Sequence, residues 1–136
     1  LEFAKSFGGI PVDVREPDAI LELSDIDAAV DSTGKSAVRA SIMQLLGKRG
    51  VLACVGHGEG LSLTVSPDLI ATERTVMGSE YFRYAEMEEN LGLLLDNRDY
   101  VGQIITHRMP RSQISEAFDL FLAGETGKVI VEADPS

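Results

Sequence analysis

Three short motifs in this sequence combine residue types that can bind ligands or perform chemistry. Gly56-His57-Gly58 follows an unbroken apolar run, Val51 to Val55. Gly34-Lys35-Ser36 and Glu80-Tyr81 each follow another apolar stretch. Glycine has no Cβ, so a ligand can approach the backbone closely, and histidine can act as a general base or a ligand. Val55, Gly56 and His57 are therefore the first candidates for a binding site.

The thiol and imidazole side chains do not form a recognisable catalytic set. Cys54 is the single cysteine, so this chain can close no internal disulfide and complete no cysteine-based zinc site. Its place inside an apolar run is typical of a buried, inert thiol. His57 is also consistent with a solvated loop histidine, and His107 with a structural role. We predict no catalytic residue and no metal ligand in this chain.

A relaxed nucleotide-binding pattern gives an alternative interpretation. Ala29 to Ser36 fits the form [AG]-x-x-x-x-Gly-Lys-[ST] between a strand-like and a helix-like segment, which is the context of a P-loop. The first glycine is missing, and Asp31 would repel a phosphate. Ala29 and Val30 are strand-like residues, which shortens the phosphate cradle. A simpler reading is a Ser or Thr cap on the following helix.

Composition narrows the class of protein. The chain has 136 residues, of which 44% are hydrophobic and 25% charged, the balance of a globular protein. A net charge of −10 argues against nucleic acid or an anionic membrane as a partner, although a nucleotide can still bind a local backbone cradle. No apolar run approaches the ~20 residues that span a bilayer, and no signal peptide is recognisable. We expect a cytoplasmic protein.

The apolar periodicity predicts alternating strands and helices in the first part of the chain. Strands are predicted at 10–14, 26–31, 51–55, 61–65, 75–79, 103–108 and 128–131, and helices at 16–24, 36–48, 66–73, 84–97 and 112–123. Residues 1–9 resemble the end of a helix closed by glycine, which suggests a piece of a longer protein. The alternation indicates a parallel α/β layer. It changes near Tyr81–Arg83, where we place a boundary.

In open parallel α/β sheets, ligands bind just beyond the carboxyl ends of the strands. Val55, Gly56 and His57 lie at the end of the strand predicted at 51–55, and Glu80 follows the strand predicted at 75–79. The fold class therefore directs the Gly-His-Gly loop and Glu80 to one edge of the sheet.

Four segments, in order, resemble the C-terminal part of the medium-chain, zinc-type alcohol and polyol dehydrogenase family. They are Asp31-Ser-Thr-Gly-Lys35, Arg49-Gly-Val-Leu-Ala-Cys-Val-Gly56, Ile105-Thr-His-Arg108, and Glu116-Ala-Phe118 leading to Gly124-Glu-Thr-Gly-Lys-Val129. Their order and spacing extend the resemblance over nearly the whole chain. The resemblance implies a partial Rossmann parallel sheet, its distal half, in residues 1–81. Residues 82–136 would then be the C-terminal return segment of the catalytic domain.

The same resemblance implies cofactor-binding roles for nine residues. Thr33, Gly34 and Lys35 match the loop beside the adenosine of NAD or NADP. Val55, Gly56 and His57 match the strand end beside the nicotinamide, and Ser79, Glu80 and Tyr81 match the turn whose backbone holds the carboxamide. The strand at 76–79 matches one that pairs across a homodimer, so a homodimer or tetramer is expected.

Other parts of the family pattern lie upstream of Leu1. They are the Gly-x-Gly-x-x-Gly pyrophosphate loop, the residue that selects NAD or NADP, and the zinc ligands. The resemblance thus implies an oxidoreductase that transfers a hydride between a small alcohol or polyol and NAD(P), with zinc held outside this chain. This piece alone would be inactive. The second alternative, a non-catalytic α/β binding domain, predicts a complete and independently stable sheet.

Overall fold

The computed structural model describes residues 2–16, 19–20 and 22–133. The chain divides into two compact units, Leu1–Tyr81 and Phe82–Ser136. Their boundary falls in the stretch where the sequence pattern changes. The helix predicted over 16–24 includes residues 17, 18 and 21, which lie outside the described residues.

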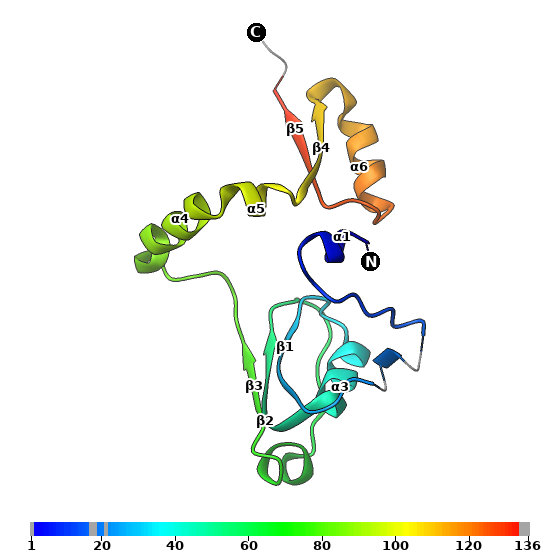
Figure 1. The fold of residues 1–136 in the computed structure, drawn as a ribbon, viewed down its shortest axis with the longest axis vertical. Helices are drawn as coiled ribbons and strands as arrows, with labels where there is room; N and C mark the ends of the chain where they lie inside the picture. Colours follow the sequence, from blue (N-terminus) through cyan, green and yellow to red (C-terminus); the bar gives the residue numbers. More distant parts are fainter. Residues whose placement is uncertain (1, 17–18, 21, 134–136) are drawn as a thin grey trace. The chain divides into compact units, whose positions relative to one another are not determined.

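The first unit contains a three-stranded parallel sheet in the order β1-β2-β3 (Figure 1). Its strands are β1 (Ile26–Asp31), β2 (Leu46–Cys54) and β3 (Thr75–Gly78). Asp31 pairs with Cys54, and Cys54 pairs with Gly78, so all three strands end at one edge. The central strand carries the predicted apolar run, and its Leu52 is 0% exposed. The predicted parallel α/β class is thus confirmed.

Helix α3 (Ser36–Leu45) connects β1 to β2 and supplies Met43 to the core formed with Leu46 and Leu52. It ends three residues before the predicted Lys48, because Leu46 already belongs to β2. The register then skips from Leu46, opposite Ile26, to Val51, opposite Ala28. The intervening residues form a bulge in which Arg49 has a φ of +66°. The apolar residues at the start of β2 also fit the helical periodicity of the preceding segment. The sequence pattern therefore does not show where the helix ends and the bulged strand begins.

Two predicted strands are wrong. Residues 10–14 and 61–65 form no ladder, and the side chain of Ile10 is 92% exposed. Leu61 and Leu63 do pack against the core, which accounts for the alternation in this segment. Alternating burial therefore arises here without backbone pairing.

The predicted helix at 66–73 is present only as a π-helical turn, η1 (Ser66–Ile70). Its N-cap is Val65 and not Ser66, and no side chain caps it. Asp68 instead accepts a hydrogen bond of 2.6 Å from the N–H of Thr64. A carboxylate within the turn therefore binds the backbone just before the turn begins.

The N-terminal helix end is confirmed. Helix α1 (Glu2–Ser6) is followed by Gly8 with a φ of +79°. The N–H of Gly8 donates to Lys5 and the N–H of Gly9 donates to Ala4, at 2.9 and 3.0 Å. This pair of bonds is the Schellman helix end that glycine favours.

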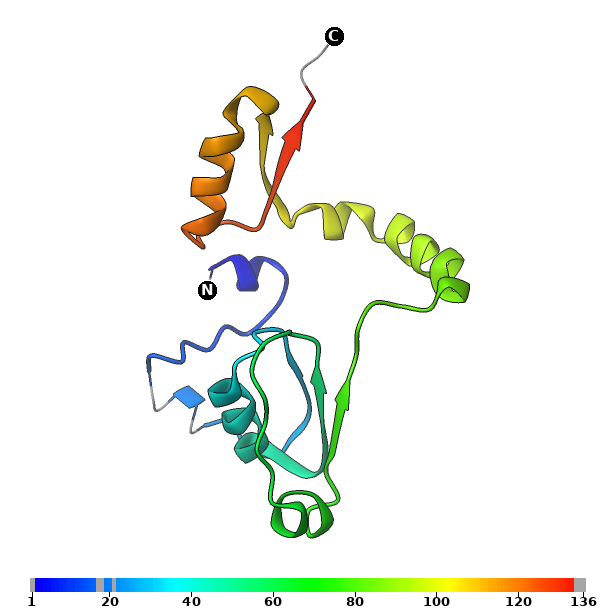
Figure 2. The same ribbon diagram turned by 180° about the vertical axis from the view of Figure 1, so that it is seen from behind.

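The second unit contains two parallel strands with a helix alongside them (Figure 2). Its elements are η2 (Tyr84–Glu86), α4 (Met87–Asp96), α5 (Arg98–Gly102), β4 (Ile105–Pro110), η3 (Arg111–Gln113), α6 (Ile114–Leu122) and β5 (Lys128–Glu132). The single helix predicted over 84–97 is divided into η2 and α4, and α5 was not predicted. The strands at 103–108 and 128–131 and the helix at 112–123 are confirmed, the first shifted by two residues, the second one residue longer and the helix shorter at both ends.

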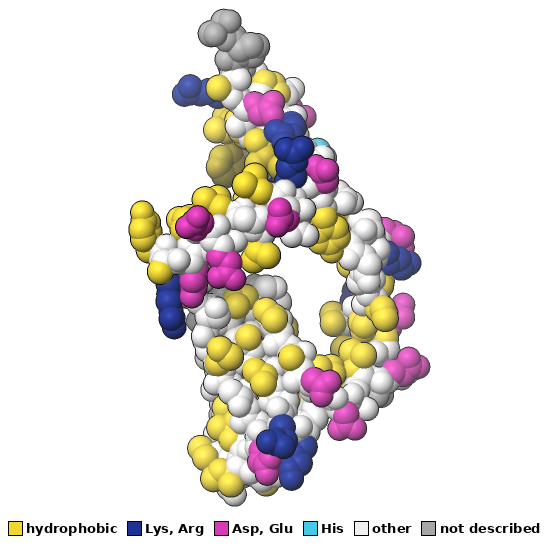
Figure 3. Space-filling view, turned by 60° about the vertical axis from the view of Figure 1, so that its left-hand side comes forward, with side chains coloured by type: hydrophobic (Ala, Val, Ile, Leu, Met, Phe, Trp, Pro, Cys, Tyr) yellow, Lys and Arg dark blue, Asp and Glu magenta, His cyan; other side chains and the backbone are white. Residues whose placement is uncertain are grey.

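Much apolar surface remains exposed on both units, as Figure 3 shows for one face. Leu91, Leu94 and Leu95 on α4 are 50%, 48% and 68% exposed. These three leucines are spaced i, i+3 and i+4 and so lie on one face of the helix. Among the described residues, no helix has the length and apolar character needed to cross a membrane.

Candidate functional site

An open pocket of about 330 Å³ lies at the carboxyl edge of the sheet, between the ends of β2 and β3. It is lined by Cys54, Val55, Gly56, His57, Gly78, Ser79 and Glu80. Five of these seven residues are predicted site residues, and they come from two segments more than twenty positions apart. The parallel register of Cys54 with Gly78 brings them together.

His57 and Glu80 face each other at this pocket. The imidazole Nε2 lies 3.3 Å from the carboxylate Oε1 of Glu80, and the two side chains are 81% and 59% exposed. An exposed pair of this kind contributes little to stability. The pair places an imidazole nitrogen and a carboxylate at the rim of the pocket, beside a floor that is mostly apolar.

The turn after β3 places its predicted residues unequally. The N–H of Ser79 donates to the carbonyl of Cys54 at 3.0 Å, so this amide extends the strand ladder. Tyr81 does not line the pocket, is 89% exposed and has a φ of +54°. Ser79 and Glu80 are therefore part of the pocket wall, whereas Tyr81 begins the connection to the second unit.

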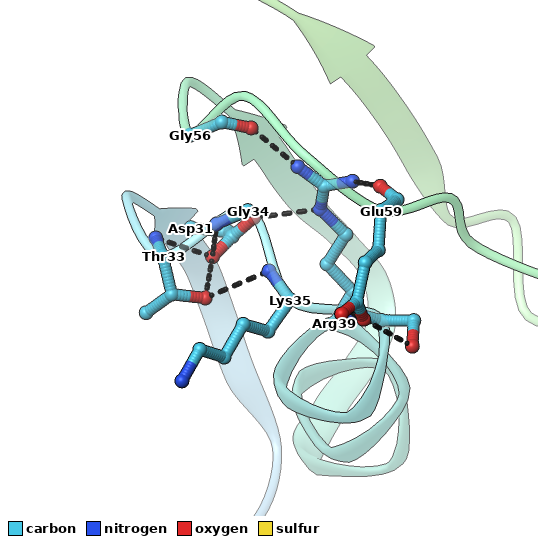
Figure 4. Close-up of polar contacts among 8 residues, drawn as sticks. Asp31, Thr33, Gly34, Lys35, Arg39, Gly56 and Glu59 are labelled. Atoms are coloured by element: carbon cyan, nitrogen blue, oxygen red, sulfur yellow. Dashed lines mark hydrogen bonds and ion pairs between the residues drawn. The ribbon is translucent and has the colours of Figure 1, made fainter.

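Thr33 and Gly34 wrap around the side chain of Asp31, as Figure 4 shows. One carboxylate oxygen of Asp31 accepts bonds from the Thr33 N–H at 2.8 Å, the Thr33 hydroxyl at 2.7 Å and the Gly34 N–H at 3.3 Å. Asp31 is 1% exposed. The Thr33 hydroxyl and, next, the Arg39 guanidinium lower the pKa of this carboxyl from 3.8 to about 2, against the opposing effect of burial.

This geometry weighs against the P-loop alternative. A P-loop needs backbone N–H groups that converge on a phosphate. Here the N–H groups of Thr33 and Gly34 converge on the protein's own carboxylate. Ala29 and Val30 belong to β1, which leaves the short loop that the sequence indicated. The side chain of Lys35 extends away from these contacts in Figure 4.

The glycines of the two loops serve close packing between the loops. The Glu59 N–H donates to the Gly34 carbonyl at 2.7 Å. A Cβ on Gly58 would lie 2.7 Å from the Gly34 carbonyl oxygen, and one on Gly56 would meet the backbone of Ser32 and Gly34. The missing side chains of Gly56 and Gly58 therefore leave room for the loop after β1, and Gly56 also lines the pocket.

Arg39 connects these loops and was missed by sequence reasoning. It is 7% exposed, and its Nε donates to Asp31 Oδ2 at 2.6 Å. Its Nη2 donates to the Gly56 carbonyl at 2.5 Å and its Nη1 to the Glu59 carbonyl. The local pattern gave no signal for Arg39, because its three partners lie 8, 17 and 20 positions away and β1, which ends in Asp31, is not a buried strand.

Glu59 occupies the N-terminus of α3. Its carboxylate accepts bonds from the N–H and the hydroxyl of Ser36, both at 2.8 Å. These bonds, with Lys35 and Arg39 nearby, lower the pKa of Glu59. The predicted Ser or Thr cap is wrong, because the N-cap residue is Lys35 and its side chain makes no capping hydrogen bond. The helix end that a P-loop would offer to phosphate already holds an anion.

The described residues do not fit a zinc site. No group of three or more His, Cys, Asp or Glu side chains among them is arranged to hold a metal ion. Cys54 is a free thiol at the pocket, and His107 lies in the second unit with its Nδ1 2.9 Å from the Thr106 hydroxyl. The site therefore consists of backbone groups, glycines and one exposed polar pair.

Comparison with known proteins identifies the family. The chain matches no family model. It is 30% identical, over 85% of its length, to an uncharacterized zinc-type alcohol dehydrogenase-like protein, YphC, of Escherichia coli K12. It is 31% identical, over 98% of its length, to alcohol dehydrogenase 3 of Hordeum vulgare. The chain spans 33% and 38% of the lengths of these two relatives.

Solved structures of alcohol dehydrogenases share the fold. The alcohol dehydrogenase TADH from Thermus sp. ATN1 has a TM-score of 0.85 and 18% identity, over 98% of this chain and 41% of its own. The 2R,3R-butanediol dehydrogenase from Bacillus subtilis has a TM-score of 0.78 and 22% identity, over 99% of this chain and 40% of its own.

These matches run through the partial Rossmann-type sheet and the pocket at its edge. The chain belongs to the zinc-type, medium-chain alcohol dehydrogenase family.

Proposed function

We propose that the chain forms one wall of an NAD(P) site in an oxidoreductase that acts on an alcohol or polyol. Val55, Gly56, His57, Ser79 and Glu80 would face the nicotinamide, and the loop at Thr33–Lys35 would face the adenosine. The observation that carries the proposal is the pocket itself, which unites two predicted cofactor segments at the carboxyl edge of a parallel sheet.

The hydrogen bonds at the end of β2 support this assignment. The N–H groups of Val55 and Gly56 both donate to the Asp31 carbonyl at 2.9 Å. In a trans peptide the carbonyl points opposite to the following N–H, so the carbonyls of Cys54 and Val55 point toward β3. The Cys54 carbonyl meets Ser79 there. The Val55 carbonyl is then an acceptor suited to the amide N–H of a carboxamide.

The two units would correspond to two domains of the full enzyme. Leu1–Tyr81 would be the distal part of the Rossmann domain, and Phe82–Ser136 the return segment of the catalytic domain. Zinc in the full enzyme would polarise the alcohol oxygen from ligands outside this chain. The free edge of β3 would pair with its copy in a homodimer or tetramer. The chain alone would not catalyse hydride transfer.

Titration of the ¹⁵N-labelled chain with two half-ligands tests the assignment. Nicotinamide mononucleotide should shift the amide signals of residues 55–57 and 79–81, and AMP should shift those of 33–35. Without a pyrophosphate loop we expect weak binding, with a Kd on the order of 1 mM. The β5 amides are the internal control. Perturbations that spread equally over both units, or none in the millimolar range, would contradict the proposal.

The P-loop alternative has a separate test. It predicts Mg²⁺-dependent ATP binding that is lost in Lys35→Ala. The wall of an NAD(P) site predicts no Mg²⁺ dependence, and binding of nicotinamide mononucleotide that Lys35→Ala leaves unchanged. A non-catalytic binding domain predicts neither.

A further inference from the structure

We infer that Arg39 is a positioning residue that aims the backbone N–H of His57 into the pocket as a hydrogen-bond donor. The inference rests on the proposed function for the identity of the ligand, an NAD(P) nicotinamide half. The aiming itself depends only on the geometry of α3 and the loop after β2.

The first step is the orientation of one peptide plane. Arg39 Nη2 donates to the Gly56 carbonyl at 2.5 Å, so this carbonyl points toward α3 (Figure 4). The described residues contain no cis peptide bond. The N–H of His57 lies across the same trans peptide and points the opposite way. Since no residue of α3 lines the pocket while Gly56 and His57 do, the N–H faces the pocket side of the loop.

The second step is that the guanidinium is itself held in one place. Its Nε bonds the Asp31 carboxylate at 2.6 Å, and its Nη1 bonds the Glu59 carbonyl. A planar guanidinium can meet three acceptors in fixed directions, which a lysine ammonium cannot do from one rotamer. Arg39 thus anchors both ends of the loop segment 56–59 to the end of β1. The loop keeps one peptide orientation without a ligand.

The third step concerns chemical complementarity. The Val55 carbonyl and the His57 N–H present an acceptor and a donor two residues apart beside one pocket. A ligand group that has both a donor and an acceptor, such as a primary carboxamide or a ribose hydroxyl, fits this pair. Reversal of the 56–57 peptide would replace the donor with a second acceptor. The ligand would then lose one hydrogen bond and face an unmatched carbonyl.

Arg39→Lys is the primary test, and Arg74→Lys is its matched control. Arg74 also donates to two carbonyls of β2, those of Leu46 and Gly47, but at the opposite end of the strand. Residual dipolar couplings of the ¹⁵N-labelled chain report the direction of the His57 N–H bond without any ligand. We expect this coupling to change in Arg39→Lys and to match the wild type in Arg74→Lys.

Binding of nicotinamide mononucleotide is the second readout. We expect Arg39→Lys to weaken it about tenfold, the loss for one hydrogen bond, and Arg74→Lys to leave it unchanged. An unchanged His57 coupling in Arg39→Lys would overturn the inference. If the wild type does not bind the mononucleotide, the proposed function fails, while the coupling still decides whether Arg39 orients the peptide.

Arg39→Lys leaves at least one of the three buried or part-buried acceptors without a hydrogen bond, and this loss can prevent folding. In that case the double variant Asp31→Asn/Arg39→Gln replaces the pair without leaving a buried charge. It should fold and show the altered His57 coupling. A wild-type coupling in the double variant would likewise overturn the inference.

Discussion

The backbone of Gly34 lies so close to the carbonyl oxygen of His57 that a Cβ on Gly34 would overlap this oxygen. Gly34 also has a φ of +69°, which L-residues rarely adopt. The loops after β1 and β2 therefore share one tightly packed contact. This contact holds the Val55–His57 segment against the loop after β1.

Gly34→Ala should destabilise the first unit by about 2–5 kcal/mol, the sum of a left-handed backbone cost and overpacking. Urea unfolding measures the change. Gly60→Ala is the control, because a Cβ there meets nothing within 4 Å. Equal stability of the two variants would show that the loops separate easily.

Asp31 should make the free energy of unfolding of the first unit depend on pH. Its folded pKa of about 2 lies below the ordinary value of 3.8. A lowered pKa contributes stability that is fully present above the ordinary value and is lost as the pH falls toward 2. Asp31→Asn should thus be less stable than the wild type at pH 7, and the difference should shrink below pH 4. Urea midpoints between pH 7 and pH 2.5 measure this convergence.

Asp13 supplies a comparison for the acid effect. Arg15 lowers the pKa of Asp13 to about 2 as well, chiefly through a side-chain hydrogen bond. Arg15 is only two residues away, so the unfolded chain can keep much of this contact. Asp13→Asn should therefore change the pH profile less than Asp31→Asn. A larger effect at Asp13 would contradict the importance of the Asp31 contacts.

Arg49→Gly should stabilise the first unit by about 0.5–1 kcal/mol. Arg49 has a φ of +66°, and glycine adopts this conformation without a steric cost. The exposed ion pair with Glu73, at 3.4 Å, contributes little that could be lost. Arg49→Ala removes the same ion pair and keeps the strain, so it should not stabilise. Thermal unfolding of both variants distinguishes strain from charge.

Limited digestion with chymotrypsin should cut the chain first between Tyr81 and Tyr84. Tyr81, Phe82 and Tyr84 are 89%, 50% and 89% exposed at the boundary of the two units. Exposed segments outside regular structure are preferred sites of cleavage. Mass spectrometry should find two fragments that meet in this stretch. A first cut at Phe118 or Phe121, within α6, would show that the second unit is the less stable part.

The sequence was sufficient for the elements that carry strong local signals. The apolar run at Val51–Val55 predicts the central strand, and the glycine pair after Ser6 predicts the end of α1. The strand ends were predicted within one residue of Asp31, Cys54 and Gly78, and the parallel class predicts that they share the edge where Gly56 and Glu80 line one pocket.

The contacts that hold the site were not predictable in the same way. Glu59 caps α3 from 23 positions beyond Ser36, so no N-terminal helix pattern contains it. Arg39 resembles a solvated helix residue until the loop after β2 covers it. The bulge at Gly47–Gly50 moves the start of β2 into residues that have helical periodicity. In each case a contact with a residue distant in the sequence overrides the local structural preference.

The bonds of Arg39 and Glu59 also bear on how the first unit unfolds. They join residues 8, 17, 20 and 23 positions apart, and so link β1, α3 and the loop after β2. No one of these segments can leave without exposing a buried charge or an unpaired carbonyl on another. Local opening of the pocket wall is therefore tied to loss of the sheet beneath it. Amide exchange at Val55, Gly56 and Glu59, whose N–H groups are hydrogen-bonded to the loop after β1 or to the end of β1, should accordingly follow the global unfolding free energy of this unit.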